Sequence, residues 1–132
     1  MRYAWTTIYV PDVAAAVGFY ERAFGLEQRF MAEGAEYAEL ETGVTALGLA
    51  ASTMAASNFV QPIRKNDAAA PPAGIEIGFE TDEVAAAYAR AIEAGAAPLA
   101  KPQQKPWWQM VAYVRDPNWV LVELGSTSTG GG

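Results

Sequence analysis

The chain of 132 residues contains no cysteine and no histidine. Disulfides, thiolate nucleophiles, thiolate metal ligands and histidine-based catalytic triads are therefore excluded. No stretch reaches the roughly 18 apolar residues needed to span a bilayer, and no basic segment followed by an apolar run stands at the N-terminus. We therefore expect a cytoplasmic protein with no membrane partner.

Basic residues are also scarce, with 9 Lys and Arg against 15 Asp and Glu, which gives a net charge of −6. This charge disfavours binding to a phosphate backbone, so nucleic acid is not expected as a partner. The chain is 52% hydrophobic and 18% charged, which is typical of a globular protein of one domain.

Two landmarks of the first half recur in the second half. Asp12, which follows a strand-like run, recurs as Asp82, and Gly25, which closes an alanine-rich stretch, recurs as Gly95. Both are displaced by 70 residues. This spacing predicts two copies of one structural unit, with a ligand site where the copies meet.

Hydrophobic periodicity predicts the same order of elements, β-α-β-β-β, in each copy. Helices are expected at residues 13–24, between an Asp12 cap and Gly25, and at residues 83–94. Strands are expected at residues 3–10, 27–31, 36–41 and 45–50, and at residues 75–80, 98–100, 110–115 and 120–124. The segment 51–73 is rich in Ala, Ser, Asn and Pro and has no sustained period. We expect an irregular linker there.

The predicted fold class is therefore α+β. Residues 1–125 form one domain of two βαβββ modules, at about 1–52 and 74–125, with a linker at 53–73. Residues 126–132 form a disordered tail.

Side-chain alternation along the strands predicts which residues line the face opposite the helices. In the first strand these are Tyr3, Trp5 and Thr7, and in the second copy Glu76 and Glu123 take the same side. Aromatic and carboxylate groups would therefore share a ligand-binding face.

Adjacent tryptophans at the entry to a strand form the most unusual short run of the chain. Trp107 and Trp108 point to opposite faces, and Gln109 and Met110 follow them. Trp108 is the first candidate for stacking on a planar ligand, and Trp107 is the second. In the alternative, structural role, one ring closes a dimer interface and the other caps the sheet. The full predicted ligand-binding set is Tyr3, Trp5, Thr7, Phe30, Tyr37, Phe59, Glu76, Trp107, Trp108, Gln109, Met110 and Glu123.

Four motifs occur in order along the chain: IYVPD at residues 8–12, FYERAFGL at 19–26, YVRDPN at 113–118 and VEL at 122–124. Together they resemble the vicinal oxygen chelate superfamily, which includes glyoxalase I, extradiol dioxygenases and bleomycin-resistance proteins. The resemblance covers residues 3 to 125. It implies a curved mixed sheet built from two βαβββ modules and commonly completed by a dimer. Trp119 stands at a turn position where the family usually carries glycine.

Metal-using members of this family place a His in the first strand and a Glu in the last strand of each module. By the resemblance, the His positions fall at Trp5 and Gly74, and the Glu positions fall at Leu47 or Gly48 and at Glu123. Because one carboxylate does not hold a catalytic divalent metal, the resemblance implies neither a metal site nor another cofactor here.

The predicted function is metal-independent binding and sequestration of a planar or amphipathic antibiotic-type molecule by a homodimer, which confers drug resistance. This chain resembles drug-binding members of the family, which place an aromatic residue near the strand that corresponds to the one following Trp107 and Trp108. The runner-up is a glyoxalase-like lyase or isomerase with a carboxylate site at Glu76 and Glu123, joined by Glu39 or Glu41. A third possibility is a structural or regulatory dimer without a small ligand.

Overall fold

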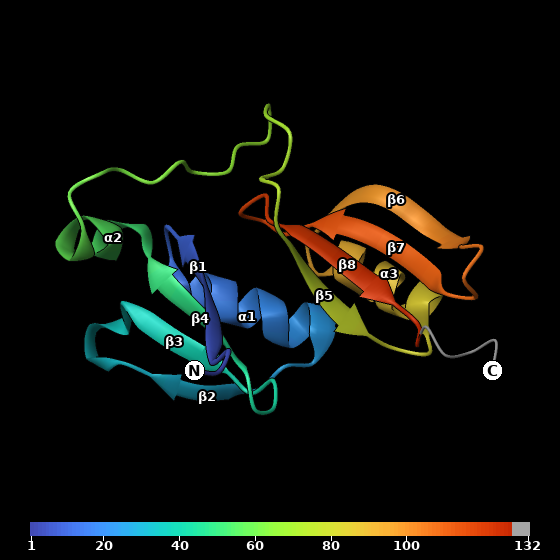
Figure 1. Cartoon of the computed structure of the whole chain (residues 1–132), viewed down its shortest axis with the longest axis horizontal. Helices are drawn as coiled ribbons and strands as arrows, with labels where there is room; N and C mark the ends of the chain where they lie inside the picture. Colours follow the sequence, from blue (N-terminus) through green and yellow to red (C-terminus); the bar gives the residue numbers. More distant parts are fainter. Residues whose placement is uncertain (128–132) are drawn as a thin grey trace. The chain divides into compact units, whose positions relative to one another are not determined.

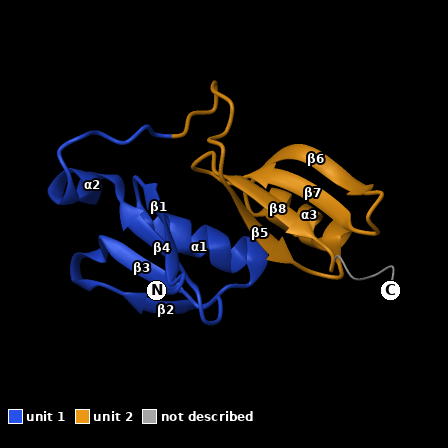
Figure 2. Cartoon of the chain, viewed as in Figure 1, with its two compact units in different colours: residues 1–65 blue, residues 66–132 orange. Residues whose placement is uncertain are grey.

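The structure is a computed structural model that describes residues 1–127 and divides into two compact units, residues 1–65 and residues 66–132 (Figure 2). Each unit folds around its own four-stranded sheet. Within the described residues, no helix is long and apolar enough to cross a membrane. The predicted disordered tail begins at Ser126, which instead hydrogen-bonds to Met110. The rest of that prediction, from residue 128 on, lies outside the described residues.

Unit 1 has the β-α-β-β-β order that the sequence predicts, followed by a second helix (Figure 1). In its sheet the strands lie in the order β1-β4-β3-β2, and β1 runs parallel to β4 while the other neighbours are antiparallel. Its elements are β1 (Trp5–Val10), α1 (Val13–Phe24), β2 (Gln28–Met31), the 3-10 turn η1 (Glu33–Ala35), β3 (Tyr37–Leu40), β4 (Ala46–Ala51) and α2 (Ser52–Asn58).

Helix α1 begins and ends where local chemistry predicts. The Asp12 carboxylate accepts a hydrogen bond from the backbone N–H of Ala15 (3.0 Å), and Gly25 ends the helix in the left-handed conformation (φ 70°). One face of the helix is buried, and its buried residues are Val13, Ala16, Val17, Phe19, Tyr20 and Ala23. Burial of this stripe against the sheet makes the core of unit 1.

Unit 2 repeats this architecture, with the strand order β5-β8-β7-β6 and with β5 parallel to β8. Its elements are β5 (Glu76–Glu80), α3 (Val84–Glu93), β6 (Ala97–Gln104), β7 (Met110–Arg115) and β8 (Leu121–Gly125). The predicted α+β class and the two repeated modules are confirmed. The dimer stays a prediction.

Two elements differ from the sequence-based expectation. Helix α2 lies in the segment predicted to be irregular, where Ala55 is its buried residue. Strand β6 is longer than predicted, although it contains Pro98 and Pro102. It pairs with β7 alone and with register shifts, so it is an edge strand, where a missing backbone N–H is tolerated.

The register of the sheets fixes which residues of the two units correspond. Thr7 pairs with Gly48, and Gly78 pairs with Glu123. Trp5 and Glu76 lie two residues before Thr7 and Gly78 on the first strand of each unit. The first residues of α1 and α3, Val13 and Val84, are separated along the chain by the same number of residues as Thr7 and Gly78. The structural counterpart of Trp5 is therefore Glu76 rather than Gly74, because Trp5 and Glu76 stand at the same distance before the first residue of the following helix. Of Leu47 and Gly48, the register selects Gly48.

Candidate functional site

In unit 2, one face of the sheet carries a phenol and two carboxylates. Tyr113 and Glu123 are register partners on β7 and β8, and Glu76 comes from β5. The alternate side chains Ala112, Val114, Val122 and Leu124 are buried. The predicted placement of Glu76 and Glu123 on the non-core face is therefore consistent with the burial pattern.

The three groups form one hydrogen-bonded cluster. The Tyr113 hydroxyl donates to Glu123 Oε2 (2.6 Å), and this bond, more than burial, raises the pKa of Tyr113 to about 12. Burial raises the pKa of Glu76, and the charge and hydrogen bond of Glu123 raise it further. The neighbouring carboxylate therefore disfavours ionisation of Glu76, and the phenol is neutral at physiological pH.

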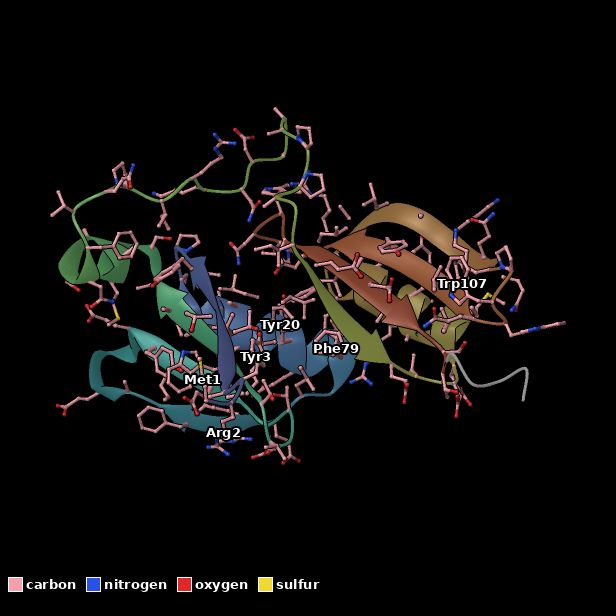
Figure 3. All side chains as sticks on the ribbon, in the orientation of Figure 1. Met1, Arg2, Tyr3, Tyr20, Phe79 and Trp107 are labelled. Atoms are coloured by element: carbon pink, nitrogen blue, oxygen red, sulfur yellow. The ribbon has the colours of Figure 1, made fainter. Side chains whose placement is uncertain are left out.

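Gln109 connects this face to a tryptophan. Its Oε1 accepts a hydrogen bond from Trp107 Nε1 (2.7 Å), and its Nε2 donates to the backbone oxygen of Ser126 (3.0 Å). A Cβ at Gly125 would lie 3.1 Å from Gln109 Nε2 and 3.5 Å from Glu123 Oε1. Gln109 and Glu123 thus lie over the same glycine, which leaves room for both. Figure 3 marks Trp107 beside the β6–β7 hairpin.

The neighbouring tryptophan occupies a different environment. Trp108 has a positive φ of 67° and its backbone N–H donates to Lys105 (3.1 Å), which closes the hairpin turn. Its ring is 68% exposed, against 54% for Trp107. Met110 follows at the start of β7, where its backbone N–H donates to the Ser126 hydroxyl (2.8 Å). The structure therefore brings Trp107, ahead of the first candidate Trp108, together with Gln109.

Trp119 also has a positive φ, of 67°, at the glycine position of the family turn. Its carbonyl oxygen accepts two hydrogen bonds from the Arg115 guanidinium (3.1 and 2.9 Å), and its ring lies 5.5 Å below that group. The same guanidinium donates to the carbonyl oxygens of Asp67 and Ala70. Trp119 thus contacts Arg115 within unit 2 through both its carbonyl oxygen and its ring.

In unit 1, the corresponding face is filled by aromatic and hydroxyl groups. A Cβ at Gly48 would lie 2.9 Å from the Tyr37 hydroxyl and 3.2 Å from Thr7 Oγ1, so no side chain fits there without displacing them. The Tyr37 hydroxyl donates to Glu39 Oε2 (2.8 Å). Burial, followed by this bond, raises the pKa of Tyr37 to about 12. Glu41 is paired with Arg29 (2.7 Å).

The other predicted residues of unit 1 lie in three places. The Phe30 ring is 6.4 Å from the Tyr37 ring, and Trp5 is 63% exposed on β1. Tyr3 precedes β1, and its hydroxyl contacts the hydroxyl of Thr6, a residue expected on the other face. Tyr3 therefore does not continue the alternation with Trp5 as predicted, because the strand begins only at residue 5. Phe59 follows α2 and is partly exposed.

Sequence reasoning missed two residues of unit 2. Tyr113 was not recognised as the partner of Glu123, although it lies ten residues before that carboxylate across a hairpin. Ser126 was assigned to the tail. Its hydrogen bonds to Gln109 and Met110 depend on strand pairing, which no local motif signals.

The residues present do not fit the metal centre of the family's metal-using members. Of the four ligand positions, Trp5 and Gly48 offer no side-chain ligand, and Tyr37 occupies the space above Gly48. Glu76 and Glu123 remain. Within residues 1–127, no three Asp, Glu, His or Cys side chains are grouped so as to hold a metal ion.

Comparisons with known proteins agree with this fold. A glyoxalase-related enzyme from Fulvimarina pelagi superposes with a TM-score of 0.84 at 19% identity, covering 96% of this chain and 88% of that one. TioX from Micromonospora sp. ML1 superposes with a TM-score of 0.70 at 19% identity, covering 96% of this chain and 98% of that one. A lactoylglutathione lyase from Agrobacterium tumefaciens superposes with a TM-score of 0.69 at 25% identity, covering 99% of this chain and 97% of that one.

No curated protein matches the chain. The family model described as "Glyoxalase/Bleomycin resistance protein/Dioxygenase superfamily" matches residues 2–124. The match spans nearly the whole sequence, including both βαβββ modules. The chain therefore belongs to the glyoxalase/bleomycin resistance protein/dioxygenase superfamily.

Proposed function

We propose that this protein binds and sequesters a small planar or amphipathic molecule without using a metal ion, and so protects its host from an antibiotic-type compound. The observation that carries the proposal is Trp107, an exposed ring held by a hydrogen bond on the carboxylate-bearing side of unit 2. Exposed aromatic rings with few rotatable bonds bind flat ligands at low entropic cost.

The polar groups beside the ring favour a ligand that carries a cation or hydrogen-bond donors. Tyr113 donates its only proton to Glu123, so its oxygen is left as an acceptor, and the carboxyl groups of Glu76 and Glu123 add negative charge. A planar ring with a protonated amine would stack on Trp107 and direct its amine to these oxygens. Unit 1 carries aromatic groups of its own on the corresponding face, from Trp5, Phe30 and Tyr37.

The test is a titration of intrinsic tryptophan fluorescence with planar cationic and neutral antibiotics, followed by mass spectrometry of the recovered compound. Trp107→Ala and Trp108→Ala are compared side by side. Loss of a buried aromatic anchor weakens binding by about tenfold or more, and we expect this loss in Trp107→Ala. A larger loss in Trp108→Ala would restore the sequence-based choice. Unchanged affinity in both variants would refute aromatic stacking at this hairpin.

A second candidate is a lyase or isomerase that uses Glu76 and Glu123 as an acid-base pair. The raised pKa of Glu76 beside a second carboxylate is the observation that favours it. Recovery of a chemically converted compound, lost in Glu123→Gln, would support this enzyme. Recovery of the intact compound at full occupancy supports sequestration.

A further inference from the structure

We propose that Gln109 is a positioning residue, which holds the Trp107 ring in one orientation and does not itself contact a ligand. The inference deepens the proposed function and rests on it for its biological meaning, but its physical content concerns the ligand-free protein. It also changes the role of Gln109, which the sequence analysis included in the predicted ligand-binding set.

Both ends of the Gln109 amide are engaged within the protein. The carbonyl end accepts the indole N–H of Trp107 at 2.7 Å, and the NH₂ end donates to the Ser126 carbonyl at 3.0 Å. An amide has one acceptor oxygen and two donor hydrogens, and these bonds orient the side chain at both ends. Its flip state is also fixed, because an indole can only donate and a carbonyl can only accept.

The far end of this chain of hydrogen bonds is anchored in the sheet. Ser126 exchanges two bonds with Met110, since its backbone N–H donates to the Met110 carbonyl (2.9 Å) and its hydroxyl accepts from the Met110 N–H (2.8 Å). Met110 begins β7. The orientation of Trp107 is thus tied, through the Gln109 side chain and the backbone of Ser126, to the β7–β8 pairing.

Trp107 needs such support because packing supplies little of it. More than half of the residue is exposed, and it sits in a hairpin turn between Lys105 and Gln109. An unrestrained exposed side chain samples several rotamers, and ordering it on binding has an entropic cost. A hydrogen bond that fixes the ring before binding removes this cost, which is the physical benefit of preorganisation.

The space that Gln109 needs is provided by a glycine. A Cβ at Gly125 would approach Gln109 Nε2 to 3.1 Å, closer than ordinary contact. Gly125 has no positive φ, so backbone conformation does not require glycine there. The absence of a side chain at residue 125 is therefore explained by the path of the Gln109 amide.

The experiment measures the indole N–H of Trp107 in the full chain without ligand. The protein is labelled with ¹⁵N-tryptophan, and the four indole signals are assigned with single Trp→Phe variants. Gln109→Met keeps the length of the side chain and removes both hydrogen bonds. We expect the Trp107 indole proton to shift upfield and to exchange with solvent at least threefold faster, while the other three indole signals keep their positions.

Two further variants separate positioning from a general effect on the strand. Gln104→Met is the matched control, since Gln104 is an exposed glutamine on the neighbouring strand, and it should leave the Trp107 signal unchanged. Gln109→Glu retains an acceptor for the indole but cannot donate to Ser126. We expect it to preserve the slow exchange of the Trp107 indole when its carboxyl is ionised.

An unchanged Trp107 signal in Gln109→Met would overturn the proposal. Exchange of the Trp107 indole in Gln109→Glu as fast as in Gln109→Met would also overturn it, because the contact with Ser126 would then control the ring. Binding is measured separately with proflavine, a planar cation. Absence of proflavine binding in the wild-type chain would count against the proposed cationic ligand class, while the indole measurements decide the role of Gln109 by themselves.

Discussion

Replacing Gly48 by alanine should destabilise unit 1 through a collision with Tyr37. The new Cβ would lie 2.9 Å from the Tyr37 hydroxyl and 3.1 Å from Tyr37 Cε1, whereas ordinary contacts begin at 3.4 Å. The ring must therefore move by about 0.5 Å. This movement strains the 2.8 Å hydrogen bond to Glu39.

The size of the effect follows from two opposing contributions. Overpacking of this kind costs about 1–3 kcal/mol, and we take about 2 kcal/mol because Gly48 is buried but Tyr37 is only partly so. Replacing glycine also reduces the entropy of the unfolded chain, which stabilises by about 0.4–1 kcal/mol. The net loss in the free energy of unfolding should be about 1 kcal/mol.

A double-mutant cycle isolates the collision. Gly48→Ala is measured by urea unfolding in the wild-type chain and in Tyr37→Ala. In Tyr37→Ala the ring is absent and only the Thr7 hydroxyl, at 3.2 Å, must rotate away, so the substitution should be neutral or slightly stabilising. The coupling free energy should be about 1.5–2 kcal/mol. Gly78→Ala is the control, because its Cβ would meet only Glu123 Oε1, at 3.9 Å. An equal cost of Gly48→Ala in both backgrounds would refute the steric reasoning.

Two predictions concern proton binding in the two phenol-carboxylate groups. The folded pKa of Glu76 is raised, so its contribution to stability is full below the unfolded pKa and is lost as pH rises through the folded pKa. Glu76→Gln should therefore raise the melting temperature at pH 7. Below about pH 4 it should leave the melting temperature unchanged, because the Glu76 carboxyl is then protonated in both the folded and the unfolded protein. Equal effects at both pH values would contradict this assignment.

Of the six tyrosines, Tyr37 and Tyr113 should ionise near pH 12 in an absorbance titration at high pH. Glu123→Gln should lower the pKa of Tyr113 alone. A simultaneous change at Tyr37 would show that the two units do not titrate independently.

Local signals were sufficient to predict most of the fold. The Asp12 cap, the Gly25 terminator and the apolar stripe between them lie within one helix, so the bounds of α1 followed from sequence. Strand β6 was cut short at its prolines, because the sequence does not tell which strand lies at an edge. Helix α2 was missed because a seven-residue helix with one buried residue leaves no hydrophobic period.

The candidate site was harder to predict from the sequence than the fold, because its geometry depends on turns and on strand register. Alternation placed Trp107 and Gln109 on one face, but only the hydrogen bond between them shows which tryptophan is fixed. The equivalence of Trp5 and Glu76 required the pairing of β5 with β8.

The repeat is most regular where the units are buried and least regular on the opposite faces. Val13 and Val84 begin equivalent helices, yet the equivalent face positions hold Trp5 in one unit and Glu76 in the other, and Gly48 in one and Glu123 in the other. The core tolerates little change because each unit must bury the same stripe. The faces carry no such requirement, so their residues are free to differ between the units.

Both units nevertheless place a tyrosine hydroxyl against a carboxylate on that face. The phenol and the acid both come from β3 in unit 1, whereas β7 and β8 supply them in unit 2. In unit 1 the hydroxyl lies over Gly48, the position that Glu123 occupies in unit 2. Acceptor oxygens therefore stand at equivalent points although the residues that supply them differ. If the proposed function holds, these acceptor oxygens favour a ligand rich in hydrogen-bond donors.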